Sequence, residues 1–193
     1  MWKRLLIIAI SMLMVVGFAD VTISVPDLDQ KIMRVTYTIV DKDAGDTGLV
    51  FPNDGYDFAA GDIKVISVTE LNTEQELEYK IVRAPKNESK QAVDITYPNP
   101  VPKGGSFKIQ VTVEAPSKYI SKDSKGRYVF SYSTSHPNLF FVLPKGHAIV
   151  YANYPVLVYE KKGHTVVQVH FGNSYSDKVQ KVIFKTRAFP TGH

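Results

Sequence analysis

The amino-acid sequence predicts an all-β protein: a single antiparallel β-sandwich, immunoglobulin-like or saddle-like, with about ten strands after a signal peptide. Three observations carry this prediction. Short segments alternate between apolar and polar residues with a period of two, and clusters of glycine, proline, asparagine and aspartate separate them. No segment shows a sustained helical period, and residues 73–78 come nearest to a turn of helix.

The first nineteen residues have the parts of a secretory signal. Lys3 and Arg4 form a basic start, residues 5–17 form an apolar core, and small residues precede the expected cleavage point after Ala19. A membrane anchor is the alternative, but it needs about 20 apolar residues and stop-transfer charges behind them. We therefore expect a mature chain that starts at Asp20, is secreted to an extracellular, cell-surface or periplasmic location, and keeps no stable membrane anchor.

The composition after cleavage fits one domain, residues 20–193, that is held together without disulfides because the chain has no cysteine. Loss of Lys3 and Arg4 lowers the basic residues from 23 to 21 against 19 acidic ones, so the formal charge is about +2. The densest basic stretches, 118–127 and 161–162, also contain acids or adjoin glycine. This argues against nucleic-acid binding, which needs a basic stripe.

Residues 106–114 give the clearest strand, because four apolar side chains alternate there with polar ones, as in a strand with one buried face. Further segments with strand-like composition complete the set in chain order: 21–25, 35–39, 63–69, 77–81, 92–97, 128–132, 148–151, 156–159, 165–171 and 179–185. Turn chemistry separates them at 41–48, 52–61, 98–105, 121–126, 161–163 and 172–177.

A group of aspartates between residues 41 and 62 is the most chemically suggestive feature. Asp41, Asp43 and Asp46 lie on a glycine-containing loop and carry the oxygen ligands that calcium prefers. The spacing fails the EF-hand pattern because Gly45 stands where an oxygen ligand is needed. Ordinary turn aspartates are therefore the main reading and calcium is the alternative; no other cofactor is expected.

No catalytic signature is present. The sequence has no H-E-x-x-H, no G-x-S-x-G, no P-loop and no cysteine nucleophile. His164 and His170 would share one side of a strand about 20 Å apart, too far for one zinc ion. We expect a protein that is not an enzyme; a hydrolase built on the carboxylates of residues 41–62 is the competing hypothesis.

Two further features suggest binding. Tyr151 and Tyr154 belong to an aromatic-rich C-terminal half and are candidate ligand-binding residues for a sugar or a peptide, although most aromatic residues there should pack in the core. Val21, Ile23 and Val25 form a short alternating strand that signal cleavage would free. This strand is either the first of its own sandwich or an assembly strand added to a neighbour's sheet edge.

Residues 98–186 resemble the N-terminal β-sandwich domain of M1-family zinc aminopeptidases. The similarity lies in PVPKGG at 100–105, FFVLPKGH at 140–147 and ANYPV at 152–156. The acidic, proline-rich signature of that domain is missing at 135–138, and the 193 residues end before a catalytic domain. The resemblance implies architecture and no peptidase activity.

These features together predict an exported, non-enzymatic β-sandwich that acts through protein partners or self-association. It would serve as a cell-surface, periplasmic or extracellular structural component, and self-association would make it a homo-oligomer. A carbohydrate- or ligand-binding accessory module is the alternative. Asn87 begins an N-glycosylation sequon, whose use depends on the source.

Overall fold

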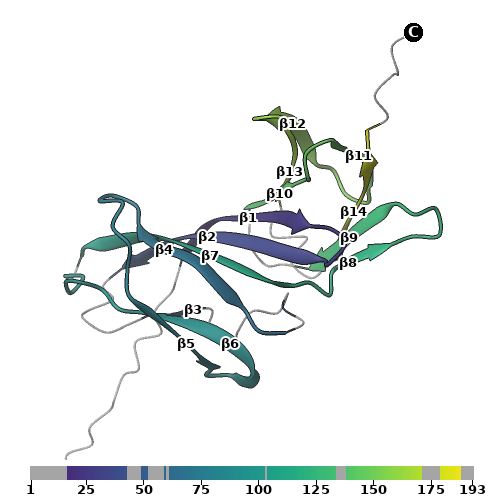
Figure 1. The fold of residues 1–193 in the computed structure, drawn as a ribbon. Helices are drawn as coiled ribbons and strands as arrows, with labels where there is room; N and C mark the ends of the chain where they lie inside the picture. The colour runs from purple at the N-terminus through teal and green to yellow at the C-terminus, as the bar shows by residue number, and fades with distance from the viewer. Residues whose placement is uncertain are drawn as a thin grey trace, which may run out of the picture.

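The computed structural model describes residues 17–42, 49–51, 59, 61–102, 104–133, 138–170 and 179–187. These residues form strands and no helix, which confirms the all-β prediction (Figure 1). The strands are β1 (Gly17–Asp27), β2 (Ile32–Lys42), β3 (Leu49–Phe51), β4 (Lys64–Glu70), β5 (Tyr79–Ala84), β6 (Asn87–Ile95), β7 (Ser106–Pro116), β8 (Ile120–Lys122), β9 (Tyr128–Ser133), β10 (Asn138–Val142), β11 (His147–Ala152), β12 (Leu157–Lys161), β13 (His164–His170) and β14 (Val179–Thr186).

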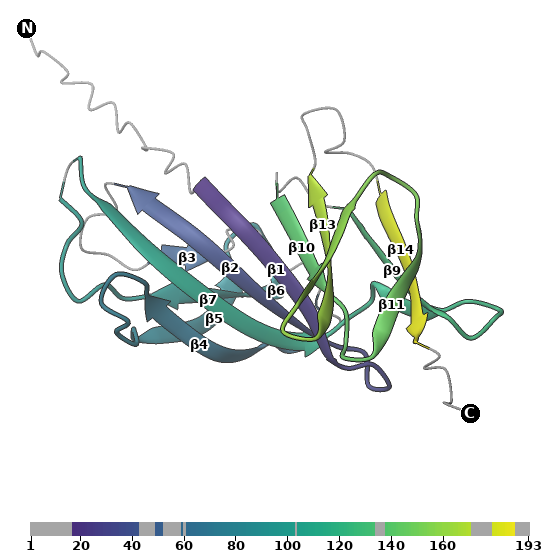
Figure 2. The same ribbon diagram turned by 90° about the horizontal axis from the view of Figure 1, so that it is seen from above.

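Three sheets make up the sandwich. A seven-stranded sheet has the order β12-β13-β10-β1-β2-β7-β4, a four-stranded sheet has the order β11-β14-β9-β8, and a three-stranded sheet has the order β3-β6-β5. All pairs are antiparallel except β1 with β10. The three-stranded sheet lies under β2, β7 and β4, and the four-stranded sheet lies at the opposite end of the large sheet (Figures 1 and 2).

The seven-stranded sheet has one apolar and one largely polar face, as the alternation in residues 106–114 predicts. Ile109, Val111 and Val113 on β7 are fully buried in the common core. On the outer face, the Thr36 and Thr112 hydroxyls lie 3.1 Å apart and hydrogen-bond across β2 and β7. Period-two alternation therefore fixes which face meets the two smaller sheets.

The core between the large and the four-stranded sheet is aromatic. The ring of Phe130 on β9 stacks on that of Phe141 on β10, with centroids 4.2 Å apart, and Phe184 on β14 meets Phe141 edge-on at 5.7 Å. All three side chains are fully buried. Close aromatic pairing of this kind joins the two sheets in the absence of disulfides.

The described residues form fourteen strands, where about ten were predicted. Two of the additional strands, β3 and β8, are three residues long and too short to show alternation. β10 lies between β1 and β13 and carries apolar residues on both faces, so period two is lost. Residues 73–78 are not helical: Thr69 bridges to Glu76, which folds this segment back on β4.

β1 pairs with β2 and β10 of its own chain. Val21, Ile23 and Val25 are buried in the core, as expected of the first strand of the chain's own sandwich. The strand begins at Gly17, three residues before the predicted start of the mature chain at Asp20. Donation of this strand to a second copy stays a prediction.

Among the described residues, the structure contains no helix that is long and apolar enough to cross a membrane.

Candidate interaction surface

β12 and β13 form a hairpin at the end of the seven-stranded sheet. Lys161 pairs with His164, which leaves Lys162 and Gly163 as a two-residue turn. Both turn residues have positive φ, 52° and 75°, as a type I′ turn requires. The turn predicted at 161–163 is confirmed, and its geometry sets the register of β12.

This register determines which backbone groups of β12 are free. In a two-residue hairpin the residues that flank the turn exchange two hydrogen bonds, and bonded and non-bonded pairs then alternate along the strands. Lys161, Tyr159 and Leu157 therefore bond to β13. The N–H and C=O groups of Val158 and Glu160 are directed to the free edge of the sheet.

β12 is also the least protected of the sheet edges in the described part of the chain. The edge strands β4, β5 and β11 contain register shifts, and β3 and β8 have three residues each. β12 has five residues in unbroken register, and all of them are exposed. Bulges and short lengths are the usual means of blocking an edge, and β12 has neither.

Three of the five exposed side chains of β12 are apolar, and the other two are Glu160 and Lys161. Leu157, Val158 and Tyr159 are 61%, 41% and 36% exposed. Of the nine large hydrophobic side chains that are exposed among the described residues, five lie between residues 150 and 159. Neighbouring exposed apolar side chains such as the three on β12 are typical of an interaction site.

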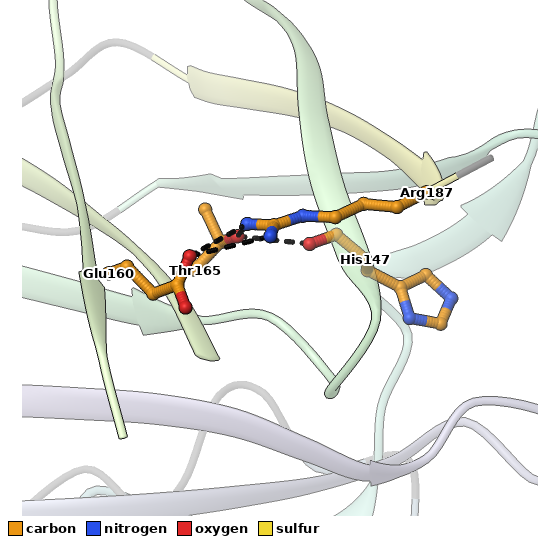
Figure 3. A network of polar contacts seen from close by, with 4 residues as sticks. All are labelled: His147, Glu160, Thr165 and Arg187. Carbon is orange, nitrogen blue, oxygen red and sulfur yellow. Dashed lines mark hydrogen bonds and ion pairs between the residues drawn. The ribbon is translucent and has the colours of Figure 1, made fainter. Parts of the chain in front are cut away.

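A polar network fixes the hairpin to the four-stranded sheet (Figure 3). Arg187, just after β14, donates to Thr165 Oγ1 at 2.8 Å and to Glu160 Oε2 at 3.4 Å. The Thr165 hydroxyl donates in turn to the backbone oxygen of His147 at 3.0 Å. These contacts link the buried Thr165 of β13, and through Glu160 also β12, to the four-stranded sheet.

Residues 118–187, which include the hairpin and the four-stranded sheet, are strongly basic. Between residues 118 and 187 the described part of the chain contains ten lysines and arginines but two carboxylates. Both carboxylates form ion pairs with arginines: Asp123 pairs with Arg127 at 2.7 Å, and Glu160 pairs with Arg187 at 3.4 Å. The Arg127 side chain that hydrogen-bonds Asp123 holds the pKa of that carboxyl below its ordinary value, so the pair is ionised at neutral pH.

Eight lysines remain, and no ion pair joins any of them to a carboxylate that the structure describes. Three of them surround the hairpin turn: Lys162 belongs to it, Lys161 precedes it at the end of β12, and the Lys145 Cε lies 3.9 Å from the position that a Cβ on Gly163 would take. All three are exposed. We call Lys145, Lys161 and Lys162 the basic tip.

The predicted ligand-binding tyrosines lie close to this surface in the chain. Tyr151 is on β11 and 50% exposed, and Tyr154 is half-buried in the connection to β12. Their role in ligand binding stays a prediction.

Of the predicted calcium ligands, Asp41 is a β2 residue whose register partner is Phe107, while Asp43 and Asp46 lie outside the described residues. Within the described ranges, no three histidine, aspartate or glutamate side chains come together as a metal site would require. The calcium site stays a prediction.

Sequence reasoning missed the β12 edge. Residues 156–159 read as one strand among many, and nothing local shows that a strand lies at the border of a sheet. The basic stretches 118–127 and 161–162 each contain too few charges to stand out. Their significance comes from the fold, which gathers them at one end together with β14.

Comparison with known proteins supports the fold. No family model matches the sequence, and no curated protein matches it. Among solved structures, the chain is similar to an M1 zinc metallopeptidase from Deinococcus radiodurans and to a mutant of that enzyme. In both cases the TM-score is 0.50 and the identity 11%, over 86% of this chain and 40% of the enzyme chain.

The resemblance predicted from residues 98–186 is therefore confirmed as a likeness of fold. The chain spans less than half the length of these peptidases. A shared architecture at this identity transfers no activity, because function resides in sites and not in the fold that carries them.

Proposed function

We propose that this protein is an exported, non-enzymatic β-sandwich that acts through protein contacts as a structural component outside the cytoplasm, and that a partner's strand adds to the β12 edge. The observation that carries the proposal is the free edge itself. It offers the backbone groups of Val158 and Glu160 in an exposed strand without bulges.

Strand addition uses both features of β12. Main-chain hydrogen bonds to the edge supply affinity, and side chains on alternate faces supply specificity. Leu157 and Tyr159 lie on the outer face and Val158 on the inner one, so an added strand meets apolar surface on both sides. Export is supported by the signal-like residues 1–19, and a non-enzymatic role by the lack of a catalytic motif in the sequence.

A proline at position 158 tests this function. Val158→Pro removes an N–H that faces the free edge but leaves the bonds from Leu157 and Tyr159 to β13, so the fold should persist while the edge is blocked. Val158→Thr is the matched control, because it keeps both the N–H and the strand propensity.

The measurement is the selection of eight-residue peptides from a random library on residues 20–193. We expect extended peptides with alternating apolar residues that bind the unmodified protein and Val158→Thr, and bind Val158→Pro at least tenfold more weakly. Peptides that bind all three proteins equally, or no enrichment at all, would contradict strand addition at β12. Circular dichroism of the three proteins shows whether the fold is kept.

A further inference from the structure

We infer that the occupant of the β12 edge is an acidic, extended segment of another protein, added antiparallel to β12 with its carboxylates first and its apolar residues after them. The inference rests on the proposed function and adds the charge, the order of residues and the direction of the partner strand.

Charge complementarity is the first reason. The basic tip, Lys145, Lys161 and Lys162, stands at the C-terminal end of β12 with no described carboxylate paired to it. The one acidic residue of β12, Glu160, is already occupied by Arg187. A partner with lysines here would meet repulsion, and a partner with carboxylates would be attracted and oriented.

The distribution of apolar surface gives the order of residues. The exposed Leu157, Val158 and Tyr159 lie at the N-terminal end of β12, away from the basic tip. We take the added strand as antiparallel because antiparallel pairs outnumber parallel ones and every described pair of this sheet except β1 with β10 is antiparallel. Such a strand begins opposite Lys161 and ends opposite Leu157. Its first residues therefore face lysines, and its last residues face the apolar part of the edge.

The outer face of the sheet extends this apolar contact. Tyr159 lies opposite Val166, and Val166 lies opposite Val142 on β10. In the neighbouring row on the same face, Gln168 lies between Leu157 and Phe140 and pairs with both. Alternate side chains of an added strand would continue this row, as cross-strand neighbours do within a sheet.

The chemistry of the basic side chains disfavours a nucleic acid as the occupant. Arginine is the preferred residue for bidentate phosphate contacts, and both arginines of this end, Arg127 and Arg187, are held by carboxylates. The lysines that remain stand beside exposed apolar side chains. A phosphate backbone would leave that apolar surface uncovered, whereas a peptide strand covers it.

Three synthetic peptides test the inference, with affinity measured by fluorescence anisotropy on residues 20–193 at low salt. The first is acidic and then apolar, Glu-Asp-Glu-Val-Thr-Val-Thr-Val. The second has the two halves exchanged, Val-Thr-Val-Thr-Val-Glu-Asp-Glu, and the third has three lysines in place of the acids. We expect the first peptide to bind at least tenfold more tightly than either of the others.

Two protein variants locate the effect. Lys161→Glu with Lys162→Glu should lower the affinity for the first peptide at least tenfold and raise the affinity for the lysine peptide. Lys80→Glu with Lys86→Glu makes the same change in net charge on exposed residues of the three-stranded sheet and its hairpin, and should leave both affinities unchanged. Val158→Pro should weaken the first peptide, and Val158→Thr should not.

The outcomes separate the inference from the function beneath it. If the acidic and lysine peptides bind equally and Val158→Pro weakens both, the acidic partner is wrong and strand addition stands. If neither peptide binds and the library selection also fails, both are wrong. If a DNA duplex binds as tightly as the acidic peptide and Val158→Pro does not weaken it, the surface recognises polyanions and the inference is overturned.

Discussion

Gln180 on β14 is a fully buried amide that lacks hydrogen-bond partners for both its nitrogen and its oxygen among the described residues. It lies opposite Tyr132, on the inner side of the four-stranded sheet. A buried polar group without partners lowers stability by its full desolvation cost. Such groups are rare in folded proteins, so each calls for a physical explanation.

Replacing this amide should stabilise the protein. Gln180→Leu keeps a similar volume and removes the unpaired nitrogen and oxygen, so we expect the free energy of unfolding to rise by about 1 kcal/mol. Urea unfolding measures the change. Gln168→Leu, at a half-exposed amide on β13, is the control with an expected change near zero. A loss of stability in Gln180→Leu would show that the amide has a partner.

Glu70 at the end of β4 is also buried, but its carboxylate is fully used. It accepts hydrogen bonds from the Thr73 hydroxyl and from the N–H groups of Asn72 at 2.9 Å and Thr73 at 2.6 Å. The Thr73 hydroxyl first, and then these N–H groups, hold the pKa of Glu70 below its ordinary value of 4.5, against the opposing effect of burial.

The lowered pKa gives a pH dependence with a definite sign. Because the folded state favours the ionised carboxyl, Glu70 stabilises the protein above pH 4.5, and this contribution is lost as the pH falls through the folded-state pKa. Glu70→Gln should therefore be less stable than the unmodified protein at pH 7, and the difference should shrink below pH 4.5. Urea unfolding between pH 3 and 7 measures it.

Glu88 on β6 is exposed, so Glu88→Gln is the control for the unfolding measurements between pH 3 and 7. A difference between Glu70→Gln and the unmodified protein that stays constant with pH would contradict the assignment.

At the scale of elements, one buried hydroxyl, that of Thr165, links the hairpin of β12 and β13 to the neighbouring sheet. Thr165 both donates to His147 and accepts from Arg187, so it connects β13, β11 and the end of β14. Arg187 in turn orders β12 through Glu160. The free edge is thus held by contacts outside β12.

Thr165→Val should loosen this attachment. The substitution keeps the shape but leaves the His147 carbonyl without its Thr165 donor and the Arg187 guanidinium with Glu160 as its one remaining described partner, so we expect a loss of about 1–3 kcal/mol in the free energy of unfolding. Thr165→Ser should recover most of it. Hydrogen exchange should show faster exchange on β12 in the valine variant. Unchanged stability and exchange would mean that the network of Figure 3 does not hold the hairpin.

The elements differ in how far the sequence alone could predict them. β7 was predictable because it lies inside the sheet with one apolar and one polar face, so alternation survives. β10 was not, since Phe140 and Val142 make its outer face apolar as well. The edge position of β12 was equally hidden, because it follows from the pairing of β13 with β10 and not from the residues of β12 themselves.

On the scale of the whole molecule, acidic and basic residues concentrate in different parts of the fold. The connection between β4 and β5 holds Glu74, Glu76 and Glu78 and no lysine or arginine. The described part of residues 118–187 holds the β12 edge and eight lysines that form no ion pair with a described carboxylate. The net formal charge of the sequence, +4, conceals this division, and a prediction from composition could not find it.

The parallel pairing of β1 with β10 sets the order of events in biosynthesis. Val21 pairs with Leu139, so the middle of the seven-stranded sheet can form only after more than two thirds of the chain has been made. Contacts between such distant residues make folding slow. A chain that folds slowly stays unfolded for longer, and passage through a narrow translocation channel, which the proposed export would involve, needs an unfolded chain.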